Sequence, residues 1–118
     1  YVIGAQTDHI CTWPAVYRSA QVLGKRSQFV LANSGHVQTL VCPPGNPKSV
    51  YYVNTAKPDS ADEWLSAATK HSGTWWDHVI GWWGERSGPM VAAPKSQGNA
   101  RHRPLAQAPG TYILERAQ

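Results

Sequence analysis

The sequence predicts an α/β domain in which two parallel strands are joined by a helix and followed by further helices and an extended tail. An apolar run at residues 1–6 and a second one at residues 28–32 (QFVLA) have the length of buried strands, and helical spacing lies between them. A helix between two strands indicates parallel pairing. The 118 residues suit one small domain, and no apolar run approaches the roughly 18 residues of a membrane-spanning helix.

The first strand is expected to end near Ala5, and the connecting helix to start at Thr12, whose hydroxyl can cap it. Pro14 falls in the first turn of this helix and Gly24 follows its last apolar residue, as is typical of helix starts and stops. The apolar positions of this helix are Trp13, Val16, Ala20 and Leu23. Residues 33–36 (NSGH) then form the turn that leaves the second strand.

The second half begins with a break at residues 42–47 (CPPGNP). Ser60 and Glu63 form a capping box that predicts a helix to about residue 71. A further helix is expected from Thr74 to the Gly-Pro pair at residues 88–89, with Trp76, Val79, Ile80 and Trp83 along its core face and Trp75 and Trp82 half exposed. The remaining tail is rich in Pro and Gly, with a short strand at residues 111–114.

The net charge of +4 lies entirely in the last third of the chain, because residues 1–85 are neutral overall. A basic tail suits either a solvated coil or an anionic partner such as a membrane, nucleic acid or a phosphorylated cofactor. Without an Arg-Gly repeat, a dense basic block or zinc-finger spacing, nucleic acid is not expected. Cys11 and Cys42 form no CxxC pair, which excludes a disulfide scaffold and a structural zinc site and favours reduced, cytosolic thiols.

Polar residues follow each predicted strand: Asp8 after the first and His36 after the second. Ligands bind outside the carboxyl ends of parallel strands, so we expect Asp8 and His36 within hydrogen-bond reach. A carboxylate beside an imidazole fixes its tautomer and prepares the other ring nitrogen to accept a proton from a nucleophile. The alternative interpretation is that both are structural caps or solvated side chains.

The order acid then histidine is that of α/β-hydrolases, whose nucleophile comes earlier on a Gly-x-Ser-x-Gly elbow. No such elbow is present, and neither cysteine is flanked by glycines. The nucleophile is therefore expected upstream of Tyr1, and the chain to be a piece of a longer protein. Asp8, His9 and His36 are also candidate metal ligands, but the side chain of His9 is expected to point away. Because no third ligand of suitable spacing then accompanies Asp8 and His36, no metal site is expected.

Several blocks of the sequence resemble the C-terminal part of the catalytic domain of polyhydroxyalkanoate synthases. They are YVIGAQTDHI at residues 1–10, FVLANSGHVQ at 29–38, PPGNPK at 43–48, EWL at 63–65, HSGTWW at 71–76 and APGTYI at 108–113. The blocks keep the family's order and span almost the whole chain. One departure is that Cys11-Thr12-Trp13 keeps the family's Trp but lacks the Pro before it.

The resemblance implies a Cys-His-Asp acyltransferase with an α/β-hydrolase fold, of which this chain holds the last two parallel strands with their crossover helix, then helices and an extended tail. Such enzymes polymerise (R)-3-hydroxyacyl-CoA into polyhydroxyalkanoate and release CoA. The catalytic residues Asp8 and His36 carry over, with Asp8 helping to activate the 3-hydroxyl for elongation, and the Cys lies upstream. The CoA thioester is the substrate, and neither cofactor nor metal is expected. The fragment alone should be inactive.

The resemblance also implies an organisation and partners. Residues 1–45 would be the end of the hydrolase core, carrying the acid and His loops, and residues 46–118 a helical and extended wrap of the same catalytic domain. The expected partners are 3-hydroxyacyl-CoA, the growing polyester chain and the granule surface, with a homodimer for the full-length protein and no membrane span. The expected location is cytoplasmic, at polyhydroxyalkanoate granules.

Two other classes of function remain open from the sequence. The six tryptophans and the basic tail would suit a non-catalytic module that binds a polymer or an anionic surface. An esterase or lipase-like α/β-hydrolase would use the same acid and histidine, with Ser in place of Cys at the upstream elbow.

Overall fold

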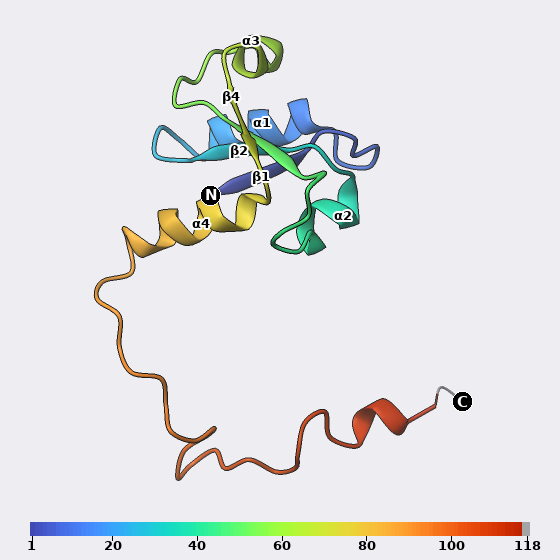
Figure 1. Cartoon of the computed structure of the whole chain (residues 1–118), viewed down its shortest axis with the longest axis vertical. Coiled ribbons are helices and arrows are strands. Elements are labelled where there is room, and N and C mark those ends of the chain that lie inside the picture. Colours follow the sequence, from blue (N-terminus) through green and yellow to red (C-terminus); the bar gives the residue numbers. More distant parts are fainter. Residues whose placement is uncertain (117–118) are drawn as a thin grey trace. The chain divides into compact units, whose positions relative to one another are not determined.

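The computed structural model describes residues 1–116 as a mixed α/β chain in two compact units, Tyr1–Gly88 and Pro89–Gln118. The first unit holds all the strands and α-helices (Figure 1). Along the chain they are β1 (Val2–Ala5), α1 (Trp13–Val22), β2 (Phe29–Ala32), α2 (His36–Val41), β3 (Val50–Val53), α3 (Ala61–Ser66), β4 (Thr69–Ser72) and α4 (Trp75–Gly84).

The strands form one sheet in the order β1-β2-β3-β4. β1 pairs with β2 in parallel, which confirms the strand–helix–strand unit predicted from the sequence. β3 and β4 extend the sheet by antiparallel pairing and were not predicted. Because β1 pairs only with β2 among the described strands, β1 forms one edge of the sheet.

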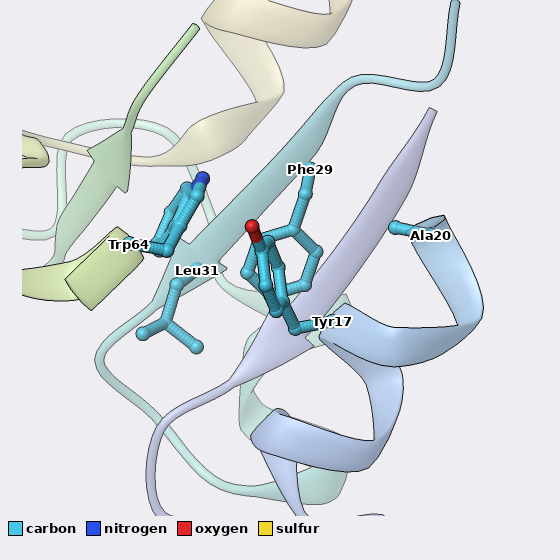
Figure 2. Close-up of a cluster of buried hydrophobic side chains, with 5 residues drawn as sticks. All are labelled: Tyr17, Ala20, Phe29, Leu31 and Trp64. Carbon is cyan, nitrogen blue, oxygen red and sulfur yellow. The ribbon is translucent and has the colours of Figure 1, made fainter. Parts of the chain in front are cut away.

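An aromatic cluster fills the face of the sheet covered by α1 and α3. Figure 2 shows its members, Tyr17 and Ala20 from α1, Phe29 and Leu31 from β2, and Trp64 from α3. The rings of Phe29 and Trp64 meet edge-on at 4.8 Å between centroids, a favourable aromatic geometry. The buried Tyr17 hydroxyl donates a hydrogen bond to the carbonyl of Pro58 at 2.6 Å, so the cluster contains no unpaired phenol.

The opposite face of the sheet packs on α4. Val30 and Ala32 alternate with the residues of the first cluster along β2 and contact Trp75 and Val79. The expected core face of this helix is confirmed in part: Val79 is buried, and Trp76 packs against the cluster partly buried. It is wrong for Ile80 and Trp83, which are exposed, and for Trp75, which was expected to be half exposed and is buried. The Trp75 indole N–H reaches the carbonyl of Thr39 at 2.8 Å, and this bond gives the ring a buried partner that the helical pattern could not reveal.

Several predicted elements differ from the structure. α2 was not predicted, α4 ends at Gly84 and not at the Gly-Pro pair, and Thr12 is the N-cap of α1 without the expected hydrogen bond from its side chain. The helix expected to reach residue 71 ends at Ser66, although Ser60 does cap it, because residues 69–72 pair with β3 instead. Tertiary pairing outweighs local propensity there. In the second unit, the strand expected at residues 111–114 is a 3₁₀ helix, Tyr112–Leu114, in which the Leu114 N–H bonds locally to the Thr111 carbonyl.

Two expectations concern larger features of the chain. Within residues 1–116, no helix combines the length and the apolar character needed to cross a membrane. The expected division at residue 45, between the end of a hydrolase core and a helical and extended wrap of the same domain, stays a prediction beside the structural division after residue 88.

Replacing Leu31 by Ala is expected to lower the free energy of unfolding by about 2–5 kcal/mol, because the side chain is fully buried between the sheet and its helices. Urea unfolding followed by tryptophan fluorescence measures the change. The matched control is Leu105→Ala, which removes the same atoms from a fully exposed side chain and should cost less than about 0.5 kcal/mol. Equal losses in the two variants would contradict the assigned core.

Candidate active site

The parallel register of β1 and β2 places two loops side by side at one edge of the sheet. Ala5 stands opposite Ala32, so the two strands end level with each other. The pairing continues past the strands through the N–H of Gln6 to the carbonyl of Ala32, at 2.8 Å, and the N–H of Thr7 to that of Ser34, at 3.2 Å. The residues that follow in each loop are therefore held close together.

Asp8 and His36 meet at this edge, as the sequence predicted. The Nδ1 atom of His36 lies 2.7 Å from Oδ2 of Asp8. The other carboxylate oxygen, Oδ1, accepts the backbone N–H groups of Ile10 at 2.8 Å and Cys11 at 3.0 Å. The Asp8 side chain is only 6% exposed, whereas the His36 side chain is 43% exposed. The carboxylate is thus enclosed by donors while the imidazole faces open space.

The surroundings of Asp8 favour its charged form. Burial raises the pKa of Asp8, but hydrogen bonds from the Cys11 N–H, from His36 and from the Ile10 N–H lower it by more, and the result is a pKa of about 2. The carboxylate therefore stays ionised at neutral pH. A charge held there stabilises any positive charge that forms on the imidazole.

The hydrogen bond to Asp8 determines the tautomer of His36. A carboxylate can only accept, so Nδ1 carries the proton and donates it, which leaves a lone pair on Nε2 of the neutral ring. His36 is the first residue of α2, and Gly35 is the N-cap. The pair can therefore act as a general base with a fixed direction.

A cleft of about 150 Å³ lies against this pair. Its lining combines Asp8 and His36 with Cys11, Thr39 and the apolar side chains of Ile3, Ala5, Val16 and Leu40. Thr39 follows His36 by one helical turn on α2, and its hydroxyl is buried without a hydrogen-bond partner among the described residues. The cleft thus combines apolar walls with the imidazole and the carboxylate.

Sequence reasoning missed Cys11 and Thr39, which line the same cleft. Cys11 lies close to the pair. Its sulfur and one ligand atom each of Asp8 and His36 lie within 4.8 Å of one another. The histidine weighed from the sequence, His9, is exposed and lies outside this cluster, in keeping with the expectation that it points away. The sequence signal that could have identified Cys11 was its short spacing from Asp8. A turn after the strand brings the two residues together.

Cys42, in contrast, is a buried structural residue. Its sulfur lies 2.7 Å from the Ser49 hydroxyl, and its carbonyl accepts a hydrogen bond from the Thr74 hydroxyl at 3.4 Å. It lies outside the cleft that holds Asp8 and His36.

The tryptophans of α4 do not form an open aromatic platform. Trp75 is buried and stacks on Trp76 with 4.6 Å between ring centroids. Trp82 is half-buried and is covered by the guanidinium of Arg86 at 4.2 Å. A larger groove of about 540 Å³ next to Trp82 shares no lining residue with the Asp8–His36 cleft. These contacts favour a packing role for the tryptophans over a polymer-binding surface.

Comparison with known proteins confirms the family resemblance. The chain is 46% identical over 116 residues to poly(3-hydroxyalkanoate) polymerase 2 of Ectopseudomonas oleovorans and 41% identical to polymerase 1 of the same organism. It is 38% identical to the poly(3-hydroxyalkanoate) polymerase subunit PhaC of Cupriavidus necator. Each alignment covers 98% or 99% of this chain but only 20% or 21% of the relative. No family model matches the chain.

Replacing His36 by Phe should raise the pKa of Asp8 above about 2, because the variant loses both the hydrogen bond and the charge of the imidazole. Carboxyl ¹³C NMR of Asp8 during acid titration measures this. Since the folded pKa lies below the unfolded value, Asp8 stabilises the wild type above about pH 4, and this contribution is lost as pH falls towards 2. The control is His9→Phe, which removes a neighbouring but exposed imidazole and should leave the Asp8 titration unchanged.

Proposed function

We propose that this segment of a poly(3-hydroxyalkanoate) polymerase relative supplies the general base and its orienting acid to an acyltransferase that polymerises (R)-3-hydroxyacyl-CoA with release of CoA. The observation that carries the proposal is the 2.7 Å contact between Asp8 and His36. The chain spans about a fifth of the length of the relatives it matches. The nucleophile and most of the substrate pocket are therefore assigned to the rest of the polymerase.

In the proposed acylation, Nε2 of His36 takes the proton of a cysteine thiol. The thiolate attacks the thioester carbon, the bond from that carbon to the CoA sulfur breaks, and CoA leaves with the proton that His36 held. A thiol beside a histidine is readily converted to the thiolate, which makes cysteine well suited to attack a thioester. Asp8 stabilises the imidazolium between these two proton transfers.

In the proposed elongation, the 3-hydroxyl of one acyl unit attacks the acyl carbon held on the cysteine. An ester bond forms, the bond from that carbon to the cysteine sulfur breaks, and the sulfur leaves as a thiolate that takes back the proton lost by the hydroxyl. The resemblance assigned activation of this hydroxyl to Asp8, but its carboxylate has a pKa of about 2, is enclosed, and accepts three hydrogen bonds. Such a group is a weak base with little access to substrate. We therefore assign the hydroxyl proton to Nε2 of His36, with Asp8 orienting the ring in both steps.

Neither cysteine of this chain suits the role of nucleophile. Cys42 is buried and hydrogen-bonded to Ser49. Cys11 lies near His36, but its own N–H and that of Ile10 are both bound to Asp8 and cannot stabilise an oxyanion. The Gly-x-Cys-x-Gly elbow that an α/β-hydrolase requires is absent from residues 1–118.

The unpaired edge of β1 supports an α/β-hydrolase fold for the whole polymerase. β1 pairs only with β2 among the described strands, and its outer edge leaves backbone groups free to bond another strand. A further parallel strand from the rest of the polymerase would satisfy them, and its carboxyl end would lie beside the Asp8–His36 edge, where the elbow carries its nucleophile.

The proposed substrate and product follow from this reaction, and the proposed assembly and location come from the family resemblance. The partners are 3-hydroxyacyl-CoA and the growing polyester chain, with the full-length protein a homodimer acting at the surface of cytoplasmic granules. The chemistry as written uses the CoA thioester as substrate and needs no cofactor or metal. An esterase with the same pair would instead release a free 3-hydroxy acid, so the product distinguishes the two activities.

In the full-length polymerase, His36→Ala is expected to slow both acylation and CoA release by about 10²–10⁴-fold, the usual contribution of a general base. Asp8→Asn should slow single-turnover acylation and steady-state elongation by the same factor, because Asp8 acts through His36 in both. Labelled 3-hydroxyacyl-CoA measures the first quantity and CoA release the second. His9→Ala is the matched control and should keep wild-type rates. Normal acylation by His36→Ala would refute the base assignment, and loss of elongation alone in Asp8→Asn would restore a direct role for that carboxylate.

Cys42→Ala in the full-length polymerase should retain CoA release within about tenfold of the wild type, because the thiol is buried away from the cleft. Replacement of the elbow cysteine in the rest of the polymerase should abolish release. A loss of about three orders of magnitude, or roughly 4 kcal/mol of transition-state stabilisation, in a folded Cys42→Ala protein would mean that the nucleophile has been misassigned.

A further inference from the structure

We propose that Asp8, Cys11 and His36 form a binding site for Zn²⁺, and that a bound ion would block the base. The proposal goes beyond the polymerase activity, because the site consists of three side chains of this chain and needs no substrate. Its basis is the convergence of a carboxylate, a thiol and an imidazole, with one ligand atom from each within 4.8 Å of the others.

The three donor types match the preference of zinc, which binds cysteine sulfur, histidine nitrogen and carboxylate oxygen. Bond lengths of about 2.0–2.3 Å place tetrahedral zinc ligands roughly 3.3–3.8 Å apart. The present spread of up to 4.8 Å therefore needs only small side-chain rotations. The side chains of Cys11 and His36 can make these rotations, because both are exposed.

The backbone already holds two of these ligands in place. The N–H of Cys11 bonds to Oδ1 of Asp8 at 3.0 Å, so the turn after β1 keeps the two residues on one side of the loop. That bond occupies Oδ1 and leaves Oδ2, which contacts only His36, to face the ion. The loop thus needs little reorganisation to present a carboxylate oxygen and a sulfur together.

A second observation, independent of the three ligands, concerns the same cleft. Thr39 lines the cleft beside them, is only 3% exposed, and its Oγ1 has no hydrogen-bond partner in the described part of the chain. Buried hydroxyls are almost always bonded. The cleft of about 150 Å³ that Thr39 lines has room for the ion and for a water at its open fourth position.

Zinc binding would remove the function of the base whichever ring nitrogen ligates. Coordination by Nδ1 replaces the proton that His36 donates to Asp8, and the tautomer is then no longer held by that bond. Coordination by Nε2 occupies the lone pair that would accept the thiol proton. Cys11 supplies the thiolate, so its loss should lower the affinity for zinc more than the loss of an unrelated thiol.

The test uses Co²⁺ as a spectroscopic probe on the purified 118-residue chain, in which only Cys11 and Cys42 could give a thiolate-to-cobalt absorption band. The wild type should show this band, and Zn²⁺ should abolish it by competition. Cys11→Ser should lose the band and bind Zn²⁺ more than about tenfold more weakly in calorimetry. His36→Ala and Asp8→Asn should also weaken Zn²⁺ binding. Circular dichroism verifies that each variant is folded.

The matched controls are Cys42→Ala, which removes the other, buried thiol, and His9→Ala, which removes the adjacent histidine. Both should keep the cobalt band and the wild-type affinity. Absence of the band in the folded wild type, its survival in Cys11→Ser, or its loss in Cys42→Ala would each overturn the proposal. Because the readout is metal binding, these outcomes are independent of whether the chain serves a polymerase.

Discussion

Parallel pairing of β1 with β2 is the constraint on which the rest of this site depends. The register sets Ala5 opposite Ala32, so the chain leaves both strands at the same level and in the same direction. Two further backbone hydrogen bonds keep the departing loops together. A shift of one residue would turn Phe29 and Leu31 out of their cluster, and the buried faces of β2 therefore resist any change of register.

The two faces of β2 explain why this register is stable. One face carries the ring cluster with Tyr17 and Trp64, and the other packs against Trp75 and Val79 of α4. Aromatic side chains fill much of the interior of a unit with few aliphatic residues. The Tyr17 hydroxyl and the Trp75 indole N–H donate to the carbonyls of Pro58 and Thr39. The bond from Trp75 to Thr39 also ties α4 to α2, the helix that begins at His36.

Asp8 both orders its own loop and orients the imidazole of His36. One carboxylate oxygen orders the turn through two backbone N–H groups, and the other directs the imidazole. These bonds outweigh the effect of burial on the pKa of Asp8 and keep it charged. The same arrangement that fixes the tautomer of His36 also brings three possible metal donors together, so the proposed base and the proposed metal site share one geometry.

The sequence by itself determined the strand–helix–strand unit, the cap at Ser60 and the meeting of Asp8 with His36. Each of these depends on short-range patterns: apolar runs, capping residues, and the rule that parallel strands end at one edge. It also determined the kinship with polyhydroxyalkanoate polymerases, through blocks that span the chain. Only the tertiary structure decided that residues 69–72 form a strand, that Trp75 rather than Trp83 is buried, and that Cys11 and Thr39 line the same cleft as His36. These depend on partners distant in the chain, such as β3 for β4 and the Thr39 carbonyl for Trp75, and local propensity carries no information about them.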